Sequence, residues 1–285
     1  MPVSPSPSIR RKRLIIELRR LREQADLTCE EVGAQLECSG TRISRIETGK
    51  IGVRPGDVRE LLEVYGVTGP DADALVQLAR EARRKGWWHT YGSVLPNWFE
   101  AYVGLESEAI RFRDFQPLNL PGLLQTPDYA RAVLRAAPTA GPADEIDRLV
   151  ALRMERQGVL SREDPPDLWI VLGENVLRTR VSDKAVMRAQ FRHLADVAER
   201  PNVTLQVLPF TAAAHVNPVS PFKILEFADP ADPAIVYLEH LTGCLFVEDE
   251  AEVRRYRVIF DHLRAEALGT GQSIDLITRM SEELA

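Results

Sequence analysis

Residues 27–50 read LTCEEVGAQLECSGTRISRIETGK and decide the fold of the N-terminal part of the chain. Thr28, followed three positions later by Glu31, forms a capping box, because each side chain satisfies a backbone donor at the start of a helix. Ser39 is a favourable N-cap for a second helix. Gly49 ends that second helix, since glycine adopts positive φ without strain. The stretch therefore predicts two short helices joined by a tight turn.

The second of these helices has an apolar face and a polar face. Ile43 and Ile46 point inward, which leaves Thr41, Arg42 and Arg45 on the outer and N-terminal part. Arginine suits a bidentate contact with guanine, and threonine offers its methyl group to thymine. In a DNA-binding helix-turn-helix, the first residues of the recognition helix lie against base edges in the major groove. The alternative is an ordinary helical hairpin with a solvated charged face.

The flanking sequence favours the DNA-binding alternative. Residues 13–24, 55–64 and 71–84 each carry apolar side chains at helical spacing, which predicts five short helices in all. The motifs LRRLREQADLT, EEVGAQL and SGTRISRIETGK follow in this order. They resemble the DNA-binding domain of the phage-repressor-like, xenobiotic-response-element helix-turn-helix family. The resemblance implies an all-α, five-helix DNA-binding head whose partner is double-stranded DNA.

The resemblance also implies roles for individual positions. The positions that correspond to base contacts are Gly40, Thr41, Arg42 and Arg45. Those that correspond to phosphate contacts are Thr28, Ser39, Ser44, Lys50 and Arg54. Phosphate contacts set register and affinity without reading the sequence. Arg22 and Glu47 match a pair that bridges the first helix to the end of the recognition helix, and we expect a partly buried, structural salt bridge there.

Three positions depart from the family pattern. Cys29 stands where a glutamine phosphate contact is usual, and a thiol is a weak donor. Glu37 occupies a turn position that often holds glycine, so it carries a modest cost if its φ is positive. Asp26 replaces another common glycine, and aspartate tolerates the left-handed conformation better. These departures leave Thr41, Arg42 and Arg45 with most of the recognition.

The charge distribution agrees with this interpretation. The 285 residues carry a net charge of −6, which is unusual for a DNA-binding protein taken whole. Residues 1–88 hold 16 Lys and Arg against 13 Asp and Glu, a net of +3, so the remainder carries −9. A weakly basic head on an acidic body predicts specific, salt-sensitive binding. The basic run at residues 10–13 is either a disordered tail or an arm that touches the DNA backbone or an adjacent minor groove.

The sequence contains no feature that predicts export or membrane insertion. Residues 1–8 are rich in proline and serine, which predicts a disordered tail and no signal peptide. No apolar segment approaches the length of a membrane span. The three cysteines, Cys29, Cys38 and Cys244, lack paired spacing and predict no disulfide framework. We therefore expect a cytoplasmic, nucleoid-associated protein.

The pattern of strands and helices predicted for the rest of the chain indicates an α/β or α+β domain. Strands are predicted at residues 109–115, 167–172, 203–208, 222–227 and 235–238, and helices at 96–106, 127–136, 143–160, 184–200, 250–267 and 273–284. We expect a tail at 1–8, the DNA-binding domain at 9–85, a linker at 86–94 and a regulatory and dimerisation domain at 95–285.

Five motifs carry a second resemblance. LPGLLQTPDYARAVL, LGENVLR, RPNVTLQVLPF, PFKILEF and IVYLEHLTG occur in this order. They resemble the large C-terminal domain, of unknown function, that follows such heads in actinobacterial, antitoxin-like regulators. The resemblance implies a transcriptional regulator that is often encoded near a small partner protein.

The C-terminal domain lacks a recognisable catalytic motif. None of the five histidines is part of a zinc-protease helix motif, and no phosphate loop is present. Glu174, Glu239 and His240 lie near strand ends, where α/β folds often place ligand sites. Capping and salt bridges are the alternative for these groups. We expect no enzymatic activity, no metal and no cofactor.

A ligand-sensing or partner-docking role fits the C-terminal domain better. The candidate residues for such a site are Trp87, Trp88, Trp98, Tyr102, His215, Tyr237 and Glu239. We expect a sequence-specific, repressor-like transcriptional regulator that binds a palindromic operator as a homodimer and responds to a small-molecule effector or a small partner protein. The alternative is an antitoxin-like interaction protein that mainly binds a partner and uses DNA binding for autoregulation.

Overall fold

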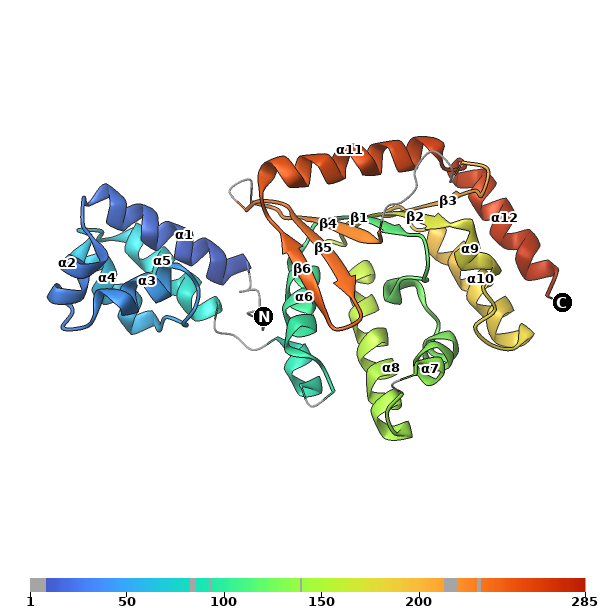
Figure 1. The fold of residues 1–285 in the computed structure, drawn as a ribbon, viewed down its shortest axis with the longest axis horizontal. Coiled ribbons are helices and arrows are strands. Elements are labelled where there is room, and N and C mark those ends of the chain that lie inside the picture. The colour runs from blue at the N-terminus through green and yellow to red at the C-terminus, as the bar shows by residue number, and fades with distance from the viewer. Residues whose placement is uncertain are drawn as a thin grey trace. The chain divides into compact units, whose positions relative to one another are not determined.

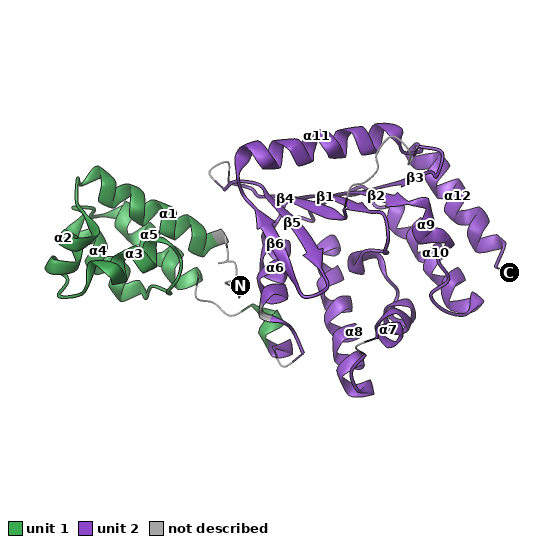
Figure 2. Cartoon of the chain, viewed as in Figure 1, with its two compact units in different colours: residues 1–89 green, residues 90–285 purple. Residues whose placement is uncertain are grey.

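The chain divides into two compact units. A computed structural model describes residues 9–82, 86–92, 94–138, 140–212, 220–229 and 232–284. The units span residues 1–89 and 90–285 (Figure 2), so their boundary falls inside the expected linker. The expected tail at residues 1–8 lies outside the described residues. No helix in the described ranges is both long and apolar enough to cross a membrane.

The N-terminal unit is built from helices. They are α1 (Ile9–Gln24), α2 (Cys29–Gln35), α3 (Gly40–Glu47), α4 (Pro55–Val64) and α5 (Pro70–Glu81), drawn in blue to cyan in Figure 1. Their apolar faces meet in one core around Leu18, Val32, Ile43 and Val58, each at most 2% exposed. The five-helix head predicted from the sequence is therefore confirmed.

Helix α1 begins before the position that the sequence suggested. It starts at Ile9 rather than at residue 13, so the basic run at residues 10–13 is helical. Arg11 Nη2 donates a hydrogen bond to the backbone carbonyl of Gly49 at 2.9 Å, and Arg10 lies 3.8 Å from Glu81. Of the two alternatives for this run, the disordered tail is therefore wrong, because these contacts to other elements of the unit hold the extra turn in place. The alternative of an arm that touches DNA stays a prediction.

The C-terminal unit contains a mixed sheet of six strands in the order β3-β2-β1-β4-β5-β6. The strands are β1 (Arg111–Gln116), β2 (Asp167–Gly173), β3 (Val203–Leu208), β4 (Phe222–Glu226), β5 (Ile235–His240) and β6 (Gly243–Val247). β1, β2 and β3 are parallel, whereas β4, β5 and β6 continue the sheet antiparallel. The predicted fold class, an all-α head followed by a mixed α/β domain, is confirmed.

The sequence analysis missed the edge strand β6. It pairs with β5 across the two residues Leu241 and Thr242, with His240 opposite Gly243. Two-residue hairpin turns usually contain Asn-Gly, Asp-Gly or a glycine at the first position, which makes them recognisable in a sequence. Leu-Thr carries no such signal, so the hairpin could not be recognised from the turn residues.

Helices cover both faces of the sheet. The helices of this unit are α6 (Asn97–Glu108), α7 (Pro127–Ala136), α8 (Ala143–Gln157), α9 (Glu174–Arg178), α10 (Lys184–Ala198), α11 (Glu250–Glu266) and α12 (Thr270–Glu282), with short 3-10 helices η2 (Gly122–Leu124) and η3 (Gly158–Ser161). A further 3-10 helix, η1 (Trp87–Tyr91), spans the boundary between the two units. In Figure 1, α11 runs along one face, and α6, α8 and α10 lie against the other. Under α11, Phe260 and Leu263 pack with Val171 and Phe222 of the sheet.

The opposite face buries a charged cluster. Arg156 of α8 donates from Nε and Nη2 to the two carboxylate oxygens of Glu106 of α6, both at 2.8 Å, and the Tyr102 hydroxyl donates to Glu106 Oε2 at 2.6 Å. Arg156 is 7% exposed and Glu106 2%. The guanidinium also lies over the Phe99 ring, 4.9 Å from its centroid. Because these buried groups satisfy one another, the pair fixes how α6 meets α8.

A second buried pair lies beside the first. Lys223 Nζ of β4 is 3.0 Å from Asp114 Oδ2 of β1. Burial raises the pKa of Asp114, and Lys223 only partly offsets this effect. For Glu106, burial also raises the pKa, but Arg156 and then Lys223 more than offset it, so the pKa lies below its usual value. Glu106 therefore stays ionised in the fold.

We predict that Glu106→Ala lowers the free energy of unfolding of the C-terminal unit by about 3–5 kcal/mol, because it leaves the Arg156 charge buried without a partner. Glu250→Ala is the matched control, since Glu250 pairs with Arg254 at the surface with side chains 85% and 68% exposed. It should cost less than about 1 kcal/mol. Chemical denaturation followed by tryptophan fluorescence measures both, and equal costs would contradict the assignment.

Candidate nucleic-acid interface

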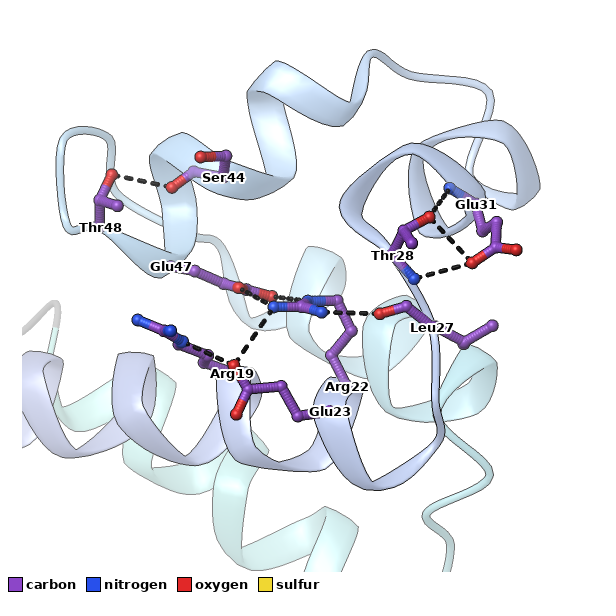
Figure 3. A network of polar contacts seen from close by, with 9 residues as sticks. All are labelled: Arg19, Arg22, Glu23, Leu27, Thr28, Glu31, Ser44, Glu47 and Thr48. Carbon is purple, nitrogen blue, oxygen red and sulfur yellow. Dashed lines mark hydrogen bonds and ion pairs between the residues drawn. The ribbon is translucent and has the colours of Figure 1, made fainter.

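Both helix caps read from the sequence are formed. Glu31 N donates to Thr28 Oγ1 at 3.2 Å, and Thr28 N donates to Glu31 Oε2 at 2.8 Å (Figure 3). At the start of α3, Ser39 Oγ accepts from Arg42 N at 3.3 Å. These bonds satisfy backbone donors that would otherwise lack partners at the two N-termini. The caps therefore set where each helix begins, and α3 begins at Gly40.

Two glycines let α2 and α3 approach closely. A Cβ on Gly33 would lie 2.7 Å from the Cys38 carbonyl oxygen, and one on Gly40 would lie 2.9 Å from Glu30 Cα. The missing side chain of Gly40 thus faces α2, so any contact of Gly40 with a base would involve its backbone. Its role as a base contact stays a prediction.

The turns around α2 use the left-handed conformation without glycine. Asp26 has φ of 55° and Glu37 has φ of 51°. The family pattern often places glycine at both positions, and this backbone geometry is the physical reason. The cost at Glu37 is modest, on the order of 1 kcal/mol. Both substitutions therefore leave the helix pair intact.

The outer face of α3 is exposed and basic. Thr41, Arg42, Ser44 and Arg45 are exposed. On the inner face, Ile43 and Ile46 are 2% and 3% exposed. The spacing of Thr41 and Arg45, four residues apart, places them on one stripe of the helix. A duplex can thus reach these side chains while the apolar face holds α3 on the unit.

The expected phosphate contacts differ in how free their side chains are. Ser44, Lys50 and Arg54 are exposed. The Thr28 hydroxyl donates to Glu31 Oε2 at 2.8 Å, so a phosphate would have to replace this bond. Ser39 likewise serves as the cap of α3. Their roles toward DNA stay predictions.

An ion pair connects α1 to the end of α3 (Figure 3). Arg22 donates from Nε to Glu47 Oε1 at 2.8 Å and from Nη2 to Glu47 Oε2 at 2.9 Å, while Nη1 donates to the Leu27 carbonyl at 2.6 Å. The side chains are 13% and 6% exposed. The hydrogen bond to Glu47 raises the pKa of Arg22. One guanidinium therefore joins α1, the segment before α2 and the recognition helix.

The sequence analysis missed Asp57. Its Oδ2 lies 3.3 Å from Arg42 Nη2 and accepts from Arg54 N at 3.2 Å, so one carboxylate caps α4 and holds an expected base-contact side chain. The pattern Arg-Pro-Gly-Asp at residues 54–57 could have indicated the cap, because proline favours the first helical position. The partner Arg42 comes from another helix, and no local pattern indicates it.

The expected site residues of the C-terminal part are only partly brought together. Tyr102 stacks on Tyr237 with ring centroids 4.2 Å apart, and the Tyr237 hydroxyl donates to Glu239 at 2.9 Å. Both rings are buried, at 1% and 2% exposure. Burial, followed by the charge of Glu239, raises the pKa of Tyr237, which keeps the hydroxyl a donor. The stack has the character of a packed core.

The other candidates lie elsewhere. Trp98 contacts Phe99 edge to face within α6, and Trp87 and Trp88 contact each other within η1. His215 lies outside the described residues. A ligand site built from this set stays a prediction.

The strand-end carboxylates lie apart. Glu174 follows β2, where it accepts from Phe210 N at 3.0 Å and pairs with Arg178 at 2.6 Å. Glu239 lies on β5, three strand spacings from β2, which is on the order of 14 Å. The described residues thus do not combine Glu174 and Glu239 in one acid–base pair.

Two capped helices with an exposed basic recognition face, inside a five-helix unit, define the class: the protein is a helix-turn-helix DNA-binding regulator with a mixed α/β C-terminal domain. Residues 13–75 match a helix-turn-helix domain family. Residues 99–279 match a domain of unknown function (DUF5753), and because this is more than half of the chain, the protein belongs to the DUF5753 family. Neither a curated protein nor a solved structure matches the chain.

We predict that Glu47→Ala lowers the free energy of unfolding of the N-terminal unit by about 3–5 kcal/mol, because Arg22 loses its buried partner. DNA binding should weaken as a result. Glu17→Ala is the control, since Glu17 lies on the same helix α1 and pairs with Arg20 rather than with Arg22. Hydrogen exchange of residues 9–82 in the intact protein reports the loosening. If exchange and DNA affinity both stay unchanged in Glu47→Ala, the pair has no structural role.

Proposed function

We propose that the protein is a repressor-like transcriptional regulator of the phage-repressor, xenobiotic-response-element type, which binds a palindromic operator as a homodimer. The observation that supports this most is the exposed stripe of Thr41, Arg42 and Arg45 on a capped and buttressed α3. Arginine pairs with guanine in the major groove, and threonine contacts the thymine methyl group. The role is non-catalytic, cytoplasmic and nucleoid-associated.

We predict that Arg45→Ala removes sequence preference by weakening specific binding roughly 5- to 150-fold, because one bidentate base contact is worth about 1–3 kcal/mol. Non-specific binding should change far less. Arg20→Ala is the control, since Arg20 is exposed on α1 and pairs with Glu17. Genome-wide recovery of bound DNA with the wild type and both variants measures the effect.

The expected result is an enriched palindromic site that survives Arg20→Ala and disappears in Arg45→Ala. Recovery of the same site with Arg45→Ala would show that α3 does not read it. An absence of any enriched site with the wild type would instead favour the alternative, an antitoxin-like interaction protein that mainly binds a partner.

The proposed dimer matches the geometry that palindromic operators require. A helix-turn-helix dimer reads two half-sites one helical turn apart, about 34–36 Å. The C-terminal unit offers an apolar surface for such a contact on the β5–β6 hairpin, where Leu241 is 95% and Leu245 56% exposed. β6 is also an edge strand, and edge strands readily pair with another chain. A small partner protein could also bind this apolar surface or pair with this edge strand.

We predict that the intact protein is a dimer and that Leu245→Arg makes it monomeric, because two like charges would meet across a symmetric contact. Truncation after residue 85 should also give a monomer with weaker operator binding. Val258→Arg is the control, since Val258 is 52% exposed on α11. Light scattering gives the mass. A truncated protein with the affinity and stoichiometry of the full chain would contradict the role of the C-terminal unit.

A further inference from the structure

The C-terminal unit contains a cavity away from the buried aromatic stack. Its volume is about 210 Å³, and it lies between η3, the end of α8 and α10. Its polar lining consists of Gln157, Ser161, His193 and Arg200, over an apolar floor that includes Leu160 and Val197. This volume is room for a small molecule or ion.

The lining is basic. The residues around the cavity include Arg200 and His193 and no carboxylate. Arg200 Nη1 donates to Ser161 Oγ at 3.0 Å. In the described part of the chain no carboxylate lies within 4.0 Å of Arg200, whereas Arg156, Arg178 and Arg131 of the same unit each pair with one. A guanidinium that borders a cavity without a carboxylate partner leaves donors for an anion from solution.

The remaining polar groups add donors and a rigid wall. Burial lowers the pKa of His193, Arg200 lowers it further, and Asp196 on the same helix partly offsets both. The neutral imidazole still offers one N–H. Gln157 Nε2 donates to the carbonyls of Gly122 at 2.9 Å and Gln125 at 2.7 Å, so this side chain is fixed in place. This part of the wall is therefore held in place before any ligand enters.

We propose that this cavity binds a small oxyanion, a phosphate or a short carboxylate, with Arg200 as the charged anchor and Ser161 and His193 as donors. The occupant would bridge η3 and α10, two segments that are distant in the chain. The binding itself does not depend on how the protein reads DNA. Its use as an effector signal rests on the proposed function, because the anion must bind the DNA-competent and incompetent states with different affinity.

Calorimetric titration of the intact protein with inorganic phosphate, and separately with succinate, tests the proposal. We expect saturable binding of at least one of the two, and the preferred probe tells a phosphate site from a carboxylate site. Arg200→Gln should weaken that binding at least about tenfold, since a charge-assisted hydrogen bond is lost. Arg200→Lys should retain part of it. Arg192→Gln, exposed on the same helix and outside the lining, should leave it unchanged.

Two further measurements locate the site. Phosphate could also bind the basic face of α3, so the titration is repeated with Arg45→Ala, which should bind as the wild type does. Hydrogen exchange should show protection at residues 157–161 and 193–200 on adding the anion. If neither probe binds, or if Arg200→Gln binds as tightly as the wild type, the proposal is overturned. A fall in the thermal stability of Arg200→Gln would then show that Arg200 only compensates the C-terminal carbonyls of α10. Either result leaves operator recognition untouched.

Discussion

The geometry of the DNA-binding face depends on the ion pair between Arg22 and Glu47. α3 is short, and an isolated helix of that length would not persist in water. Its apolar face, with Ile43 and Ile46 buried, holds it against the core and decides which side faces outward. The planar guanidinium fixes the C-terminal end of α3 to α1, because it donates to Glu47 and to the Leu27 carbonyl at once. The buried carboxylate, in turn, would be costly without this arginine. The proposed recognition chemistry at the exposed end of α3 therefore relies on a charge pair at its buried end.

Local chemistry explains what could be predicted from the sequence. The caps at Thr28 and Ser39 involve side chains and backbone groups within three residues of each other, so the helix starts were correct. The strand Val203–Leu208 was also correct, since its composition and flanking residues are self-contained. Contacts between distant segments were not accessible in this way. The pairing of Asp57 with Arg42 and the hydrogen bond from Arg11 to Gly49 each join separate elements.

In the C-terminal unit, too, local patterns could be predicted from the sequence, whereas contacts between distant segments could not. Its strands follow from apolar runs, yet the charged side chains among them do not look like core residues. Glu106, Asp114 and Lys223 are at most 9% exposed, because each finds its partner on another element. Only the fold brings these partners together. The cavity beside η3 could likewise not be predicted, since Ser161, His193 and Arg200 form no motif and come together only when η3 and α10 meet in the fold.

The order of strands in the sheet has a consequence for synthesis of the protein. β1 is central, and it pairs with β4 through Phe115 and Phe222, which lie more than one hundred residues apart. At typical elongation rates of about 5–20 residues per second, β4 is synthesised roughly 5–20 s after β1, and the two strands cannot pair before then. The N-terminal unit makes its contacts within a short stretch of chain and needs no such wait. On the ribosome, a folded DNA-binding unit should therefore precede a completed sheet, and a truncated translation product would be able to bind DNA without the C-terminal unit.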